Sequence, residues 1–346
     1  MDIKSIDVSI VIVNYKTPDL LKDCVQSIIQ NTRGVNYEII IVDNNSEDES
    51  EQLIKSVYPE VKWLNTGYNA GFARANNLGI LNAEGNYILL LNSDTIVNEN
   101  TLIKTISEYK NLEESHVKVG FLGCQLIDLN GNIQFNSRTK FMNIQKLFLA
   151  HPFVILFYRL FRIKEENKEE SYRKNLELHK TFHETKWLGG TYLFFNKRLI
   201  KEKNNLLDED FFMYGEDTEW SLRIGRKGYK HFFTPNASVI HAEGGSFKIK
   251  APKWIQIALS EWLFLLKGYG KIVFFIVALV NLTGIKLDNY FTRRQLRKNT
   301  SGVNEQLIEQ YNLRRQIELV MKRNFFKVLF KYKKKPSSSP NYLKNI

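Results

Sequence analysis

The chain has 346 residues, of which 43% are hydrophobic, 13% aromatic and 25% charged. Because a usual domain has ~150 residues, this length predicts one large domain with an appendage, or two domains, and excludes a single small module. The apolar content is enough for a sizeable core, and it excludes a chain that is disordered throughout.

Cysteine use and the first residues both bear on the compartment. Only two cysteines occur, Cys24 and Cys124, which excludes a disulfide scaffold and favours a reducing environment. The chain starts MDIKSIDVSIVIVN, where acidic residues come early and the apolar run is short, so no signal peptide is visible. We therefore expect a cytoplasmic protein.

The positive charge is unevenly distributed. Residues 291–346 contain 14 Lys or Arg and three Glu, and so carry +11 of the formal net charge of +12. Residues 1–290 are nearly neutral. This pattern predicts a neutral body with a basic appendage that is attracted to an anionic surface.

Strand and helix patterns alternate over the first 125 residues. Apolar runs predict strands at Val8 to Val13, Tyr37 to Val42, Val61 to Leu64, Tyr87 to Leu91 and Val117 to Gly123. Helices are predicted after the Thr17-Pro18 start signal and near 48–57, 70–83 and 99–112. Continuous apolar strands separated by helices predict a mostly parallel sheet covered on both faces, with ligands at the carboxyl ends of its strands.

Polar residues gather where these strands end. The first strand ends in Asn14-Tyr15, the second at Asp43, and the fourth in Asn92-Ser93-Asp94. No glycine-rich dinucleotide or P-loop motif follows any of them, which disfavours those chemistries. Asp43 is suited to accept the N3 hydrogen of a pyrimidine or to form an Asx turn. Asp94 is suited to a divalent cation on a diphosphate or to a simple turn.

The second half adds candidate acids and a histidine. Glu216 and Asp217 begin a predicted helix that ends near Gly228, where the helix dipole favours an ionised carboxylate, as a general base or as a plain cap. His241 follows the strand pattern ASVI and precedes two glycines. It is either a metal ligand or a hydrogen-bonded loop histidine.

The order of these motifs is more specific than any one of them. The chain contains, in sequence, VSIVIVNYKTPDLLKDCVQSI, YEIIIVDNNSEDES, NAGFARANNLGI, YILLLNSDTIV, WLGGTYLFFNKRLI, DEDFFMYGEDTEW and HAEGGS. Over roughly residues 5–250 it resembles the family 2 glycosyltransferases, and most closely their rhamnosyltransferase-like branch. The resemblance implies an α/β GT-A fold with a mostly parallel central sheet, followed by a C-terminal helical extension that associates with membranes.

The resemblance also implies an activity. It implies inverting transfer of a sugar, with L-rhamnose from dTDP-rhamnose favoured, to a lipid-linked or growing cell-surface polysaccharide acceptor. The alternative within this class is a hexosyl-, N-acetylhexosaminyl- or galactofuranosyltransferase that uses a UDP-sugar.

Site residues follow from the resemblance, motif by motif. Asp43 would hold the pyrimidine, and the nucleotide-sugar pocket would be lined by Asn14, Tyr15, Arg74, Asn92 and Asp94. Asp94 and His241 would bind Mg²⁺ or Mn²⁺. Asn92 stands where the family more often has an acid, which removes one charge from the metal motif.

The resemblance assigns the base and the acceptor contacts as well. Asp217 matches the second acid of the family's Glu-Asp pair and is the favoured base, with Glu216 as the alternative or as an acceptor contact. Trp187 and Trp220 are predicted acceptor contacts, although large aromatic side chains equally suit a core.

Three regions are predicted. Residues 1–250 form the catalytic domain, with an insertion at about 139–186 near the acceptor whose apolar run predicts either a core helix or an interfacial segment. Residues 251–332 form a helical, basic extension, and residues 333–346 a disordered basic tail. The longest uncharged stretch of the extension, residues 272–285, is too short for a confident spanning helix.

The extension is predicted to lie on the anionic inner face of the cell membrane, because apolar helices with basic flanks suit in-plane attachment. The alternative is packing against the catalytic domain or another subunit of a homo-oligomer. Two other function classes are disfavoured. A nucleic-acid-binding protein would interleave basic and aromatic residues on a folded surface, whereas the body is neutral. An inactive scaffold would not need Asp43, Asp94, Asp217 and His241 together.

Overall fold

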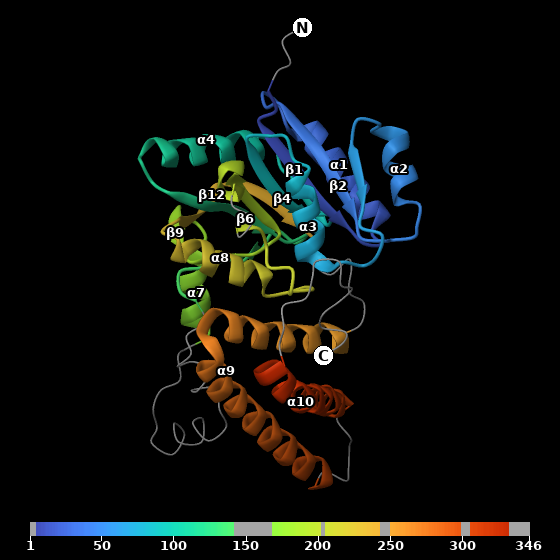
Figure 1. Cartoon of the computed structure of the whole chain (residues 1–346), viewed down its shortest axis with the longest axis vertical. Coiled ribbons are helices and arrows are strands. Elements are labelled where there is room, and N and C mark those ends of the chain that lie inside the picture. The colour runs from blue at the N-terminus through green and yellow to red at the C-terminus, as the bar shows by residue number, and fades with distance from the viewer. Residues whose placement is uncertain (1–4, 142–167, 202–204, 243–249, 299–304, 332–346) are drawn as a thin grey trace.

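The computed structural model describes residues 5–141, 168–201, 205–242, 250–298 and 305–331. They form an α/β body and a helical extension that lies beside it (Figure 1). The apolar run of the predicted insertion and the predicted tail at 333–346 lie outside the described residues.

A central sheet forms the middle layer of the body. Its first half is parallel and has the order β3 (Lys62–Asn65), β2 (Tyr37–Asp43), β1 (Val8–Asn14) and β4 (Tyr87–Asn92). It continues through β11 (Tyr192–Asn196), which is antiparallel to β4, and then β6 (Val119–Ile127), β12 (Lys230–His241) and β5 (Thr95–Val97). The predicted α/β class is confirmed, and the five predicted strands are present within a few residues of their predicted bounds.

Helices cover both faces of this sheet. On one face lie α1 (Pro18–Asn31), α2 (Ser50–Val57) and α4 (Thr101–Glu114), and on the other α3 (Gly71–Leu81) and α8 (Glu216–Arg226). Side chains alternate along β1, so that Ile10 packs with Leu21 of α1 while Val11 packs with Ala73 of α3. Burial on both faces explains why the strands read as continuous apolar runs.

Short elements complete the body. They are β7 (Ile133–Gln134), β8 (Ser137–Arg138), α7 (Lys168–Leu178), β9 (His183–Thr185), β10 (Trp187–Leu188) and the 3₁₀ helix η1 (Lys197–Ile200). β7 pairs with β6, and β8 pairs with β10 in a separate two-stranded sheet. The pairing of β8 with β10 joins segments that are about 50 residues apart in sequence.

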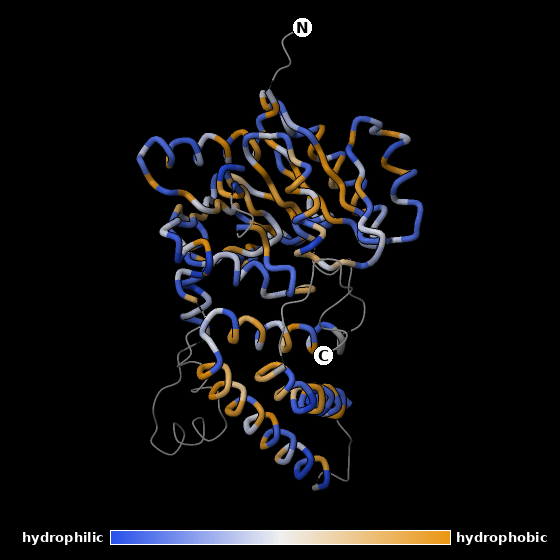
Figure 2. Tube along the Cα trace, in the orientation of Figure 1, coloured by the Kyte–Doolittle hydropathy of each residue, from blue (hydrophilic) through white to orange (hydrophobic). Residues whose placement is uncertain are grey.

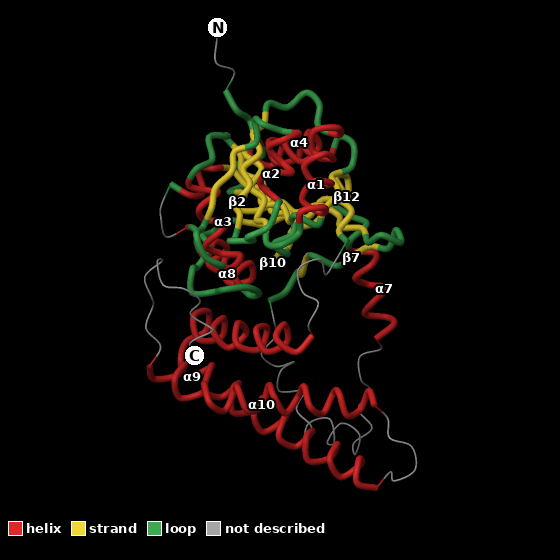
Figure 3. Tube along the Cα trace, turned by 90° about the vertical axis from the view of Figure 1, so that its right-hand side faces the viewer, coloured by secondary structure: helices red, strands yellow, loops and turns green. Residues whose placement is uncertain are grey.

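The predicted extension is helical and consists of α9 (Lys250–Lys298) and α10 (Glu305–Lys331). Gly270, at φ 86° and ψ 174°, divides α9 into two arms (Figures 1 and 3). Phe264 of the first arm packs with Leu222 of α8, whereas Phe274 of the second arm packs with Phe325 of α10. Figure 2 shows apolar residues along both helices, outside the core of the sheet.

Candidate functional site

Asp43 lies at the carboxyl end of β2 and is held by three donors. Its Oδ1 accepts hydrogen bonds from Asn14 Nδ2 at 2.8 Å and Ser46 Oγ at 2.6 Å, and its Oδ2 accepts one from Ser46 N at 2.9 Å. Asn14 is beside Asp43 because the register of β1 and β2 pairs them. These bonds fix the orientation of the carboxylate and leave Oδ2 able to accept one more hydrogen bond.

Asp94 and His241 meet at the edge of the sheet. His241 Nε2 lies 3.4 Å from Asp94 Oδ1, and both side chains are largely buried. The antiparallel pairing of β12 with β5 sets this contact, because it places His241 opposite Thr95, and Ala242 N donates to Asp94 O at 3.0 Å. Nitrogen and oxygen at this separation suit two ligands of one divalent cation.

Glu216 and Asp217 begin α8 after the left-handed residues Tyr214 and Gly215. Asp217 accepts hydrogen bonds from Gly190 N at 3.1 Å, Thr218 N at 2.6 Å and Thr218 Oγ1 at 3.1 Å. Burial raises the pKa of Asp217, while these donors and the Trp187 indole oppose the shift.

Glu216 differs from Asp217 in its surroundings. Its side chain is buried, and Oε2 has no hydrogen-bond partner among the described residues. Burial, followed by the neighbouring charge of Asp217, raises the pKa of Glu216 well above that of an ordinary carboxyl group. The structure therefore favours Glu216 as the protonated and Asp217 as the ionised member of the pair.

Hydrogen bonds lead from Asp43 to the neighbour of Asp94, and from Asn92 to the neighbour of the residue that bonds to Asp217. Asp43 bonds to Asn14, Asn14 Oδ1 accepts from Thr17 Oγ1 at 3.1 Å, and Thr17 Oγ1 lies 3.2 Å from Ser93 Oγ, beside Asp94. On the other side, Asn92 N donates to Thr191 O at 3.1 Å, next to the Gly190 N–H that bonds to Asp217. The carboxyl ends of β1, β2 and β4 and the start of α8 thus share one region.

The other residues that were predicted to bind the nucleotide sugar border this region and differ in their burial. Asn14 is fully buried, so it positions Asp43 instead of lining an open pocket. Arg74 is buried too, and its Nε donates to Glu209 O at 3.1 Å. Tyr15 is partly exposed, and Asn92 Nδ2 donates to Thr191 Oγ1 at 3.5 Å.

The two tryptophans that were predicted to contact the acceptor differ in their burial. Trp220 is fully buried between Phe121 and Phe195, and its indole nitrogen donates to Asn205 O at 2.6 Å, so the prediction that it contacts an acceptor is wrong. Its place in α8 turns it toward the sheet. Trp187 is partly exposed, and the guanidinium of Arg138 lies 4.9 Å from its ring centre.

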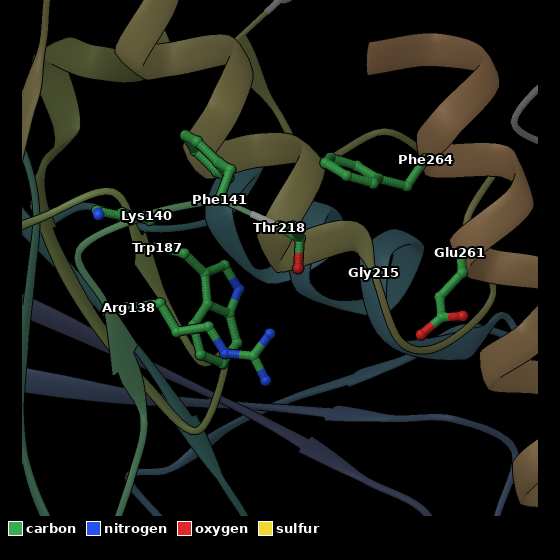
Figure 4. A pocket seen from close by; sticks show the side chains of 8 residues that line it. All are labelled: Arg138, Lys140, Phe141, Trp187, Gly215, Thr218, Glu261 and Phe264. Carbon is green, nitrogen blue, oxygen red and sulfur yellow. The ribbon is translucent and has the colours of Figure 1, made fainter. Parts of the chain in front are cut away.

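Trp187 and Thr218, the residue that follows Asp217, line an open pocket of about 90 Å³ (Figure 4). The pocket is lined by Arg138, Lys140, Phe141, Trp187, Gly215, Thr218, Glu261 and Phe264. Thr218 connects it to the base candidate through the hydrogen bond to Asp217. Glu261 and Phe264 belong to α9, so the helical extension supplies part of the wall.

No site role was predicted from the sequence for the residues that complete this region. Thr17, Ser46, Ser93 and Thr191 are common turn and strand-end residues, and only the packing of distant segments gives them partners. The same holds for Gln134, whose Oε1 lies 2.8 Å from His241 Nδ1.

Comparison with known proteins relates part of the chain to a family. Residues 9–168 match the sequence model of glycosyl transferase family 2. The O-antigen biosynthesis protein RfbC of Myxococcus xanthus is 27% identical over 265 residues, which are 74% of this chain and 19% of RfbC. The chain therefore spans about a fifth of the length of that relative.

Two further proteins are similar over more of their own length. A dolichyl N-acetyl-alpha-D-glucosaminyl phosphate 3-beta-D-2,3-diacetamido-2,3-dideoxy-beta-D-glucuronosyltransferase of Methanococcus voltae is 23% identical over 77% of this chain and 76% of its own. The crystal structure of S. aureus TarS 1-349 superposes with a TM-score of 0.47 at 13% identity, over 93% of this chain and 92% of that one.

Proposed function

We propose that this chain, whose residues 9–168 match the sequence model of glycosyl transferase family 2, transfers a sugar from a nucleoside diphosphate to an acceptor hydroxyl with inversion. One observation carries the proposal. Asp43, Asp94, His241 and Asp217 come from distant parts of the chain, yet hydrogen bonds and strand pairing connect them around the carboxyl ends of β1, β2 and β4. This is where a sheet of this kind binds ligands.

The proposed reaction is a single displacement. The acceptor hydroxyl gives its proton to Asp217 as its oxygen bonds to the anomeric carbon, and the bond from that carbon to the diphosphate breaks. The electron pair leaves with the nucleoside diphosphate. Asp217 suits the base role because its carboxylate is held by Gly190 and Thr218, and because burial raises its pKa and makes it more basic than an ordinary aspartate.

Asp94 and His241 would hold a divalent cation. Their Oδ1 and Nε2 atoms face each other at 3.4 Å, and their donor set, one carboxylate and one imidazole, fits Mn²⁺ and also Mg²⁺ completed by phosphate oxygens. The cation would neutralise charge on the departing diphosphate. Asn92, at the end of β4, donates from its side chain to Thr191 Oγ1.

For the donor, we propose dTDP-L-rhamnose, with a UDP-sugar as the alternative. Asp43 recognises the N3 hydrogen that thymine and uracil share, and so it selects a pyrimidine without separating the two nucleotides. The motif resemblance to the rhamnosyltransferase-like branch supports rhamnose. A panel of dTDP-, UDP- and GDP-sugars in a thermal-shift assay with Mn²⁺ would identify the donor.

For the acceptor, we propose a lipid-linked or growing cell-surface polysaccharide that enters the pocket beside Trp187 and Thr218. The relative from Methanococcus voltae is named for a dolichyl phosphate-linked sugar, and RfbC for O-antigen biosynthesis, which supports this class. The first arm of α9 lines the same pocket, so the extension would hold the acceptor side of the enzyme near the membrane.

We further propose that the extension lies on the cytoplasmic face of the membrane. By length and composition, α9 is the helix among the described residues that could cross a membrane. The break at Gly270 favours in-plane attachment instead, because it leaves a second arm whose apolar face is partly exposed. Exposed Lys271 and Lys286 flank that face.

Replacing Asp217 by Asn tests the base assignment. The variant retains a side chain of the same shape but cannot take a proton at neutral pH, so transfer should fall about a hundredfold or more, while the affinity for the donor nucleotide should change little. Transfer is measured by release of the nucleoside diphosphate, and binding by calorimetry.

Glu216→Gln is the matched variant at the neighbouring carboxylate. It should retain most of the transfer activity. Near-normal turnover in Asp217→Asn, or a larger loss in Glu216→Gln, would refute the assignment of Asp217.

A further inference from the structure

Gln134 holds His241 at two points. Its Oε1 lies 2.8 Å from His241 Nδ1, and its Nε2 donates to the main-chain oxygen of the same histidine at 3.2 Å. The two residues meet because β6 pairs with both of their strands, with Leu126 opposite Gln134 and Ile127 opposite Ile240. One amide group therefore restrains both the ring and the backbone of His241.

The main-chain contact fixes which way the amide of Gln134 points. A carbonyl oxygen only accepts hydrogen bonds, so the group that faces the oxygen of His241 must be the NH₂ of Gln134. The side-chain oxygen then faces Nδ1, and because this oxygen only accepts, Nδ1 must carry a hydrogen. In the neutral imidazole, Nε2 is left with its lone pair.

That lone pair faces a carboxylate. His241 Nε2 and Asp94 Oδ1 are 3.4 Å apart, and neither side chain is more than 14% exposed. Two acceptors side by side repel each other, and a cation shared between them would relieve this repulsion. The other neutral tautomer would place a hydrogen on Nε2 and direct it at Asp94, and this would remove the nitrogen ligand.

We propose that Gln134 is a positioning residue that keeps His241 as the Nδ1–H tautomer, so that Nε2 and Asp94 Oδ1 together form a ligand pair for a divalent cation. The inference rests on the proposed metal-assisted function and adds the residue that prepares the site. It follows the general pattern in which the second nitrogen of a metal-binding histidine donates to a neighbouring acceptor.

The test combines a spectroscopic and a binding measurement on the full chain. Nitrogen-15 spectra of the histidine rings, recorded without metal at a pH where imidazole is neutral, report which ring nitrogen of His241 is protonated. Loss of the His241 signals in His241→Ala identifies them. Binding of Mn²⁺, added as the chloride, is followed by the electron paramagnetic resonance of the free ion.

The variant Gln134→Met has a side chain of similar size but no amide. It should lose the Nδ1–H tautomer and bind Mn²⁺ about tenfold or more weakly. Gln134→Glu retains an oxygen opposite Nδ1, so Nδ1 should stay protonated. Gln125→Met is the matched control, because Gln125 lies on the neighbouring β6 and donates to His179 O instead. It should leave the His241 spectrum and Mn²⁺ affinity unchanged.

The outcomes separate this inference from the proposed function. An Nε2–H tautomer in the unaltered protein, or unchanged Mn²⁺ affinity in Gln134→Met, would overturn the role of Gln134 even if the protein transfers sugar. Failure of the unaltered protein to bind Mn²⁺ would overturn the ligand pair. Failure of the proposed function alone would appear as absent nucleotide-sugar turnover with the tautomer and metal binding as expected.

Discussion

At the scale of single residues, the site depends on neighbouring groups of the same type that are placed in different surroundings. Glu216 and Asp217 are adjacent carboxyl groups, but hydrogen-bond donors surround Asp217 while Glu216 Oε2 has no partner among the described residues. Two buried carboxylates so close together do not both ionise easily. The surroundings of the two carboxyl groups, more than their residue types, determine which one is protonated and which one is ionised.

This difference predicts a pH dependence of stability. The pKa of Glu216 is raised in the folded chain, so the folded state binds more protons than the unfolded state between the ordinary carboxyl pKa and the raised one. The contribution of Glu216 to stability is thus fully present at acidic pH and is lost as the pH rises through that window. Glu216→Gln should lack this loss.

Chemical denaturation at about pH 5 and about pH 8 measures the effect. The difference in unfolding free energy between Glu216→Gln and the unaltered chain should shift in favour of the variant at the higher pH. Glu99→Gln, at an exposed position, is the control and should show no such shift. Parallel pH dependence of all three proteins would mean that Glu216 is ionised in the folded state.

At the scale of elements, the start of α3 is joined to the loop that precedes Glu216 and Asp217. Phe72 N donates to Phe212 O at 2.7 Å, and Arg74 Nε donates to Glu209 O. The contact requires a glycine before Phe72, because a Cβ on Gly71 would lie 2.2 Å from Phe212 O, and Gly71 has a φ of +79°. The nucleotide side and the base side of the site are therefore mechanically coupled.

The variants Gly71→Ala and Gly67→Ala separate the cost of a left-handed backbone from the cost of a clash with Phe212. Gly67 has a φ of +75°, and no atom lies within 4 Å of the position that a Cβ would take, so its replacement should cost about 1–2 kcal/mol through backbone strain alone. Gly71→Ala should cost a further ~1–3 kcal/mol, because the methyl group displaces the loop. Urea denaturation compares them, and equal losses would show that the loop yields freely.

The elements of the body were predictable because their signals are local. Each parallel strand is a short apolar run that ends in polar residues, and these ends supplied Asp43 and Asp94. The antiparallel β11 between β4 and β6 was not predicted, since its neighbours lie about 70 to 100 residues away in sequence. The same limitation applies to Gln134, which has no role until β6 brings it to His241. Trp220 was misassigned because sequence alone did not show which face of α8 meets the sheet.

At the scale of the whole molecule, the extension connects the acceptor pocket to a surface outside the body. Lys267 pairs with Asp208 and Asp210, and Ser260 Oγ donates to Met213 O at 2.8 Å, so the first arm of α9 is fixed to the loop before Glu216. The second arm packs on α10. Binding of the extension to a membrane would therefore affect a loop that is close to the proposed base, Asp217.

An exposed stripe on the second arm consists of Ile272, Phe275, Ile276 and Leu279, at helical spacing. We predict that Ile272→Ser with Ile276→Ser weakens binding to anionic vesicles at low salt about tenfold or more, since each buried isoleucine contributes roughly 1.5–3 kcal/mol. Sedimentation with the vesicles measures binding.

Leu81→Ser, at a position on α3 that is 62% exposed, should bind the vesicles like the unaltered chain. Absence of the unaltered chain from the pellet would contradict membrane attachment. If the chain were instead a dimer in solution that the two serine substitutions convert to a monomer, the stripe would be a contact between copies.

The most direct test of the central claim is a crystal structure with a pyrimidine nucleoside diphosphate and Mn²⁺. We expect the N3 hydrogen of the pyrimidine within hydrogen-bond reach of Asp43 and the cation bound by Asp94 and His241. The terminal phosphate, which carries the sugar in the donor, should point toward the region of Asp217. A nucleotide bound elsewhere on the chain, or at Asp43 with its diphosphate directed away from Asp94, would contradict a single transfer site.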